Sequence, residues 1–281
     1  MAHQLRVVHT TGYHYADGVS ASHNEARMTP RSTRDQVVLA TKLDISPTAW
    51  THSFRDYWGT QVTAFEIAER HERLRVVATS TVEVSDRPAR GLGLTWDALR
   101  DPDLLDQQIE MVSLTEHVEP LAELRRFAEA AARDSRSPGE AVHAIVNRIR
   151  EQVEYVPGST GVQTRAGEVW DRGAGVCQDM VHLSLGALRC AGVPARYVSG
   201  YVTPTRNPEI GVPRTGESHA WLQFWDGVWV GVDPTNDATP GDLYVEVGVG
   251  RDYFDVPPLK GVYSGSRSSD MFVEVEITVL A

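Results

Sequence analysis

A single cysteine directly after a glycine-rich bend constrains this chain more than any other feature. Residues 173–180 read GAGVCQDM, and the run 177–190 carries apolar residues at helical spacing before the stop signals Gly192 and Pro194. We therefore expect Cys177 to open a helix that packs on the core. The helix dipole and the unpaired amides of the first turn favour a thiolate, the form that attacks a carbonyl carbon.

Two strand-like segments further along the chain form a predicted hairpin that carries a histidine and an aspartate. Segments 219–225 and 228–232 flank Asp226-Gly227, a strong two-residue turn signal. His219 and Asp233 lie at nearly equal distances from this turn, so the pairing brings an imidazole close to a carboxylate. A cysteine with a histidine base and an orienting aspartate is an arrangement for acyl transfer.

The rest of the pattern predicts an α+β chain of two domains. Strand-like segments fill residues 5–85, with gaps too short for crossover helices, so we expect a β-rich domain of antiparallel hairpins at 1–90. After a linker at 87–91, a second domain at 91–281 opens with helices at about 92–153. The expected strands are 5–15, 36–45, 61–68, 74–84, 195–202 and 271–279, and the expected helices are 103–112, 118–134 and 138–153.

Composition excludes several classes of protein. A net charge of -11 over 281 residues disfavours nucleic acid and anionic membranes as partners. Two cysteines are too few for a disulfide framework or a zinc cluster, and the histidines of the first domain match no ligand spacing, so we expect no metal and no cofactor. Without a signal-peptide core or a run of roughly 20 apolar residues, we expect a cytoplasmic protein.

The chain resembles the transglutaminase-like superfamily of papain-fold thiol enzymes, in its bacterial branch with an extra N-terminal β domain. The resemblance implies a papain-like core in which the cysteine helix packs on an antiparallel sheet. It also implies that Cys177 is the nucleophile, His219 the general base and acid, and Asp233 the orienting group. The matching runs are GVCQD at 175–179, GVPARYVSGY at 192–201, SHAW at 218–221, DPTN at 233–236, HTTGYHY at 9–15, TPR at 29–31 and WG at 58–59.

The residues and the resemblance together predict a cysteine-dependent hydrolase or acyltransferase that acts on peptide-like amide or isopeptide bonds. Water as the acceptor gives a peptidase or amidase, which we favour, and an amine gives a protein-glutamine transglutaminase. A module that only binds a peptide or a partner protein is the non-enzymatic alternative. The resemblance also implies an ATP-grasp ligase-like partner. Because no EF-hand or HExxH pattern is present, we expect activity to resist chelators.

Secondary site residues are less well specified by the sequence. The backbone amide of Cys177 is the expected first oxyanion donor. Trp170 and Gln163 remain alternatives for the second donor, while Trp221 and Tyr201 are possible walls of the cleft. Of the other residues of the cysteine helix, we expect Asp179 to serve the helix dipole, and His182 and Cys190 to serve the packing.

Overall fold

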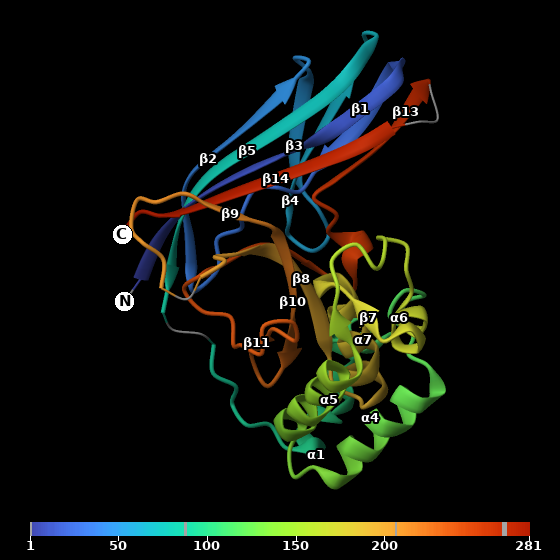
Figure 1. Ribbon diagram of the computed structural model, residues 1–281. Coiled ribbons are helices and arrows are strands. Elements are labelled where there is room, and N and C mark those ends of the chain that lie inside the picture. The colour runs from blue at the N-terminus through green and yellow to red at the C-terminus, as the bar shows by residue number, and fades with distance from the viewer. Residues whose placement is uncertain (1, 87–88, 206, 266–268) are drawn as a thin grey trace.

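Two large antiparallel sheets, one short parallel pair of strands and a group of helices make up the described part of the molecule (Figure 1). The computed structural model describes residues 2–86, 89–205, 207–265 and 269–281. In Figure 1 the larger sheet lies at the top, the smaller sheet below it, and the helices at the lower right. This arrangement confirms the expected α+β class.

The first sheet is organised by β1 (Ala2–Ala26), a strand of 25 residues. The early part of β1 pairs with β5 (His71–Ser85) and β14 (Ser269–Val279), and its late part pairs with β4 (Gln61–Ile67) and β13 (Leu259–Gly265). All these pairings are antiparallel, as the short gaps within 5–85 predicted for β4 and β5. The other strands of this sheet are β2 (Gln36–Ser46), β3 (Trp50–Arg55) and β9 (Arg214–Gly216).

The C-terminal strands correct the expected division of the chain at residue 90. β13 and β14 pair with β1 in the first sheet, with Leu5 opposite Val279, so they do not belong to the second domain. Alternation of residue types predicts that 271–279 is a strand, but it does not identify the strand's partner. Here the partner is set by packing, because Val275, Ile277 and Val279 fill the same apolar cluster as Leu5.

The second sheet has the strand order β11-β10-β8-β12. Its strands are β8 (Ala195–Val202), β10 (Ser218–Trp225), β11 (Trp229–Val232) and β12 (Tyr244–Gly250). Strand β12 is not predicted by its residue pattern, because glycines at 248 and 250 lower its strand propensity. At Gly248 a Cβ atom would lie 2.9 Å from Oγ1 of Thr60, so close contact with the first domain requires this glycine.

The helix predicted at 138–153 begins where expected, the one predicted at 118–134 begins only at Ala122, and the one predicted at 103–112 is broken into short pieces. In α5 (Pro138–Gln152) the Ser137 side chain accepts a hydrogen bond from the Glu140 amide, as expected for an N-cap. Of the predicted linker, residues 87 and 88 lie outside the described residues. The remaining helices are α1 (Trp96–Leu99), α2 (Pro102–Gln107), α3 (Ile109–Val112), α4 (Ala122–Asp134), α6 (Ala166–Arg172), α7 (Cys177–Cys190) and the 3-10 turn η1 (Tyr253–Asp255).

Helix α7 spans the predicted run 177–190 and lies at the centre of the core. It is buried over nearly its whole length, between the second sheet and helices α4, α5 and α6. At Gly186 a Cβ atom would lie 1.8 Å from the carbonyl oxygen of Val118, so only glycine fits there. Within the described ranges, no helix combines the length and the apolar character needed to cross a membrane.

A buried hydrogen bond between a tyrosine of the second sheet and a histidine of the first supports a prediction about stability. The Tyr201 hydroxyl on β8 lies 2.8 Å from Nδ1 of His9 on β1, and both residues are buried. Because Tyr201→Phe leaves that nitrogen unpaired, we expect it to lower the free energy of unfolding by about 1–3 kcal/mol in urea titrations. In the matched control Tyr263→Phe, where the hydroxyl lies in an exposed pair with Ser269, we expect a change within about 0.5 kcal/mol. Equal effects of the two substitutions would contradict this prediction.

Candidate active site

Local turns place Cys177 at the first position of α7. Gly173 ends α6 in the left-handed conformation, with φ 69°. The chain then pairs as β7 (Ala174–Gly175) with β6 (Glu154–Tyr155) and enters the helix. The side chain of Cys177 is half-buried and forms no disulfide. The predicted helix-opening thiol is therefore present, and it has access to solvent.

Asp179 fixes this end of the helix. Its Oδ2 accepts hydrogen bonds from the Val176 amide at 2.7 Å and from the Thr160 hydroxyl at 2.5 Å, and the residue is only 1% exposed. Burial raises the pKa of Asp179, and these two hydrogen bonds oppose the shift. The side chain thus caps the helix and ties the 157–164 loop to it, in keeping with its expected structural role.

The hairpin carries His219 and Asp233, but its turn differs from the predicted one. Trp225 pairs with Trp229, so three residues rather than two form the loop. In this register Asp233 lies on a diagonal from His219, and not directly opposite it. The diagonal still brings the side chains together, with His219 Nε2 2.7 Å from Asp233 Oδ2.

Asp233 is fully buried and is surrounded by hydrogen-bond donors. Its Oδ1 accepts from the amides of Thr235 and Asn236, while its Oδ2 accepts from the Asn236 side chain at 2.7 Å and from the Tyr244 hydroxyl at 2.8 Å. Burial raises the pKa of Asp233, but the hydrogen bond and charge of His219, together with these donors, bring it below the ordinary value. The group is thus held as a carboxylate next to the imidazole.

His219 interacts with Asp233 and with Cys177. Burial lowers the pKa of its imidazole, but hydrogen bonds and charge interactions with Asp233 and Cys177 outweigh this effect and raise the pKa to about 9. Because Nε2 faces Asp233, Nδ1 is the nitrogen left for the thiol. The arrangement favours an imidazolium at neutral pH, which can stabilise a thiolate and can later donate a proton.

This electrostatic arrangement predicts the titration of one imidazole. In ¹H–¹⁵N NMR spectra, His219 should keep both ring protons until the pH reaches about 9. In Asp233→Asn the midpoint should fall toward the ordinary value of 6.5. Since the folded-state pKa is raised, the stabilisation it reflects is complete below pH 6.5 and is lost as the pH rises through about 9. A midpoint near 6.5 in the unmodified protein would contradict this account.

Trp221 and Tyr201, the two residues expected to form walls of the cleft, have different surroundings. The Trp221 ring stacks on His219, with centroids 6.2 Å apart and an interplanar angle of 23°, and it is 2% exposed. Trp221 therefore packs beside the imidazole. Tyr201 bonds His9 in the apolar cluster between the sheets, so its hydroxyl is committed to the domain interface.

The two alternatives for a second oxyanion donor, Trp170 and Gln163, lie in different environments. Trp170 is buried in the helical core, and its indole N–H donates to Glu123 of α4 at 3.4 Å, so this donor is already used. Gln163 is exposed in the loop before α6.

His182 is fully buried and accepts a hydrogen bond from the Tyr253 amide, whereas Cys190 is half-buried at the end of α7.

Sequence reasoning missed three residues near the reactive groups. Tyr244, whose hydroxyl binds Asp233, comes from the unpredicted strand β12 and carries no local signal. Asn236 lies within the DPTN run, so its position after the aspartate was available as a signal. The exposed Tyr155 has its pKa raised, first by partial burial and then by the charges of Cys177 and Glu217. Among the described residues, no group of three or more His, Cys, Asp and Glu side chains is placed to hold a metal ion.

The chain is similar to known proteins along its whole length. Residues 5–83 match the model of the bacterial transglutaminase-like N-terminal region, and residues 125–234 match that of the transglutaminase-like superfamily. An uncharacterized protein of Mycobacterium leprae is 41% identical over 278 residues, which cover 99% of each chain. A protein-glutamine gamma-glutamyltransferase of Pseudomonas aeruginosa is 29% identical over 136 residues, 46% of this chain and 20% of that protein.

A solved structure shares the fold. It is that of a proposed cysteine protease from Cytophaga hutchinsonii, which superimposes with a TM-score of 0.80 at 22% identity and covers 100% of this chain and 92% of the other. The expected papain-like core with an N-terminal β domain is therefore confirmed as a fold.

Proposed function

The chain belongs to the transglutaminase-like superfamily, and on that premise we propose that it is a cysteine-dependent hydrolase of peptide-like amide or isopeptide bonds. The observation that carries the proposal is the position of His219, which interacts with both Cys177 and the buried carboxylate of Asp233. In this proposal Cys177 is the nucleophile, His219 the general base and acid, and Asp233 the group that orients the imidazole.

The proposed reaction has two halves. The Cys177 thiolate attacks the amide carbon, and the new C–S bond gives a tetrahedral oxyanion to which the Cys177 backbone amide can donate. The C–N bond then breaks as His219 gives its proton to the departing amine, which leaves a thioester. In the second half, water attacks the thioester, His219 accepts a proton from that water, and the thiolate leaves with an acid as the product.

Transfer to an amine is the second candidate reaction. It follows the same first half, but a primary amine replaces water, as in the reaction named for the Pseudomonas aeruginosa relative. That relative matches only part of this chain, so we favour hydrolysis, which needs no bound second substrate. A non-enzymatic peptide-binding module is the third candidate, and the ionic pairing around His219 argues against it.

Trapping of the acyl-enzyme tests these candidates together. The protein is mixed with a peptide library, quenched in acid and examined by mass spectrometry, with and without an added primary amine. We expect an acyl adduct on Cys177 and an acid product, with no adduct in Cys177→Ala. An amide product in the presence of the amine would assign transfer. Peptide binding of equal strength by both proteins, with no adduct on either, would overturn the enzymatic proposal.

A further inference from the structure

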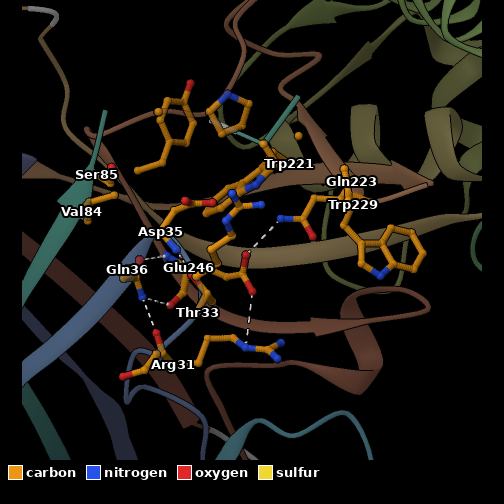
Figure 2. Close-up of a pocket in the computed structure, with 18 of the residues that line it drawn as sticks. Arg31, Thr33, Asp35, Gln36, Val84, Ser85, Trp221, Gln223, Trp229 and Glu246 are labelled. Carbon is orange, nitrogen blue, oxygen red and sulfur yellow. Dashed lines mark hydrogen bonds and ion pairs between the residues drawn. The ribbon is translucent and has the colours of Figure 1, made fainter. Parts of the chain in front are cut away.

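A cavity of about 330 Å³ lies between the first domain and the second sheet (Figure 2). The 31–36 segment, which leads into β2, forms one wall, and residues of β8, β10, β11 and β12 form the other. Trp221, Trp229 and Tyr244 supply aromatic surface. This volume is within the range of about 300–1,000 Å³ that small-molecule sites occupy.

The backbone around the cavity is held firmly. The Gln36 side chain donates to the carbonyls of Arg31 and Glu246 and accepts from the Glu246 amide at 2.8 Å. The two bonds to Glu246 join the first domain to β12 beside the cavity (Figure 2). The cavity is therefore a fixed part of the domain interface.

The charges that line the cavity oppose the charge of the whole protein. Arg31, Arg34 and Arg196 line it together with Asp35 and Glu246, so the lining has three positive and two negative groups and a net charge of +1. The chain as a whole carries -11. A local excess of positive charge in an acidic protein favours an anionic ligand at this position.

The guanidinium groups of Arg31 and Arg196 both interact electrostatically with the carboxylate of Glu246. Glu246 lies 3.4 Å from Nε of Arg31 and also accepts from the Gln223 amide at 3.0 Å. Nε and Nη1 of Arg31 are buried, and neither has a hydrogen-bond partner among the described residues. Arg196 donates from Nε to Gln223 at 2.7 Å, and its guanidinium lies 4.3 Å from the centre of the Trp229 ring.

We propose that this cavity binds a small molecule in which a carboxylate is attached to an apolar group. The carboxylate would accept from the unpaired Nη1 of Arg31 and would balance the second guanidinium, that of Arg196. The apolar group would pack on Trp229 and Trp221. Burial lowers the pKa of Arg196 to about 10, in agreement with a cation whose compensation inside the protein is incomplete.

The position of the cavity links such a ligand to the reactive groups. Trp221 stacks on His219, and the Tyr244 hydroxyl donates to Asp233, so two walls of the cavity also contact the imidazole and its carboxylate. Binding in this cavity would thus act on Cys177 only indirectly. The inference does not depend on the proposed reaction, because binding is measured without turnover.

Calorimetric titration with benzoate and its neutral isostere benzamide tests the proposal. We expect benzoate to bind, and we expect Arg31→Gln to lower its affinity at least about tenfold. The affinity for benzamide should be much lower than that for benzoate. The matched control is Arg126→Gln, at an exposed arginine on α4, and it should leave benzoate binding unchanged. Cys177→Ala should also leave it unchanged, which separates this site from the reactive thiol.

Several results would overturn the proposal. They are the absence of heat at millimolar benzoate, equal affinity for benzamide, and a loss in Cys177→Ala or Arg126→Gln as large as that in Arg31→Gln. If Arg31→Gln fails to fold by circular dichroism, nuclear Overhauser effects between benzoate and the Trp229 indole in the unmodified protein decide the question. Their presence supports the site, and their absence overturns it.

Discussion

The Cys177→Ala variant is expected to lose all turnover and all rapid labelling by iodoacetamide at near-neutral pH. The substitution removes the sulfur that interacts with His219, so neither attack on a carbonyl carbon nor alkylation can occur there. Mass spectrometry of the intact protein gives the number of labels, and peptide mapping gives their position. Circular dichroism should show an unchanged fold, since the side chain is small and half-buried.

Cys190→Ala is the matched control, because it removes the other free thiol from the same helix. Burial raises the pKa of Cys190, so little thiolate should form there at neutral pH. We expect this variant to keep turnover and to be labelled as fast as the unmodified protein. Rapid labelling at Cys190 with Cys177 left intact would refute the assignment of the nucleophile.

Asp233→Asn is expected to reduce kcat by up to about 10⁴-fold, the scale found when the carboxylate of a catalytic triad is replaced by an amide. The amide carries no charge to hold an imidazolium, and its NH₂ group meets the donors of Asn236 and Tyr244. Steady-state kinetics give kcat, and the His219 midpoint described above should fall in the same variant. Both effects have one physical cause.

Asp171→Asn provides the control for Asp233→Asn, because Asp171 is an exposed carboxylate on α6. It should leave kcat unchanged. If Asp233→Asn folds normally and also keeps its full kcat, then the carboxylate does not orient the base, and the proposed mechanism fails at that step.

Local features of the fold could be predicted from the sequence. The cysteine helix has its predicted limits, and the Ser137 cap begins its helix as expected, because both depend on neighbouring residues. The hairpin was predicted as well, but with a turn one residue too short. The prediction that His219 and Asp233 lie close together holds because the side chains reach along the diagonal.

Features that depend on distant parts of the chain could not be predicted. Strand β12 contains Gly248, which the contact with Thr60 explains, and Tyr244 reaches Asp233 from that strand. Tyr201 lies in a motif beside the cysteine helix, yet it bonds His9, 192 positions earlier in the chain. The local sequence around an aromatic residue does not indicate which distant residue its side chain will pack against.

The return of β14 to β1 also determines when the protein can fold during its synthesis. Leu5 leaves the ribosome long before its partner Val279, so one edge of β1 has unpaired amides and carbonyls while the entire second domain is made. Pairings between such distant residues form slowly, because a large loop must close first. The first sheet is therefore completed only after β14 has been synthesised.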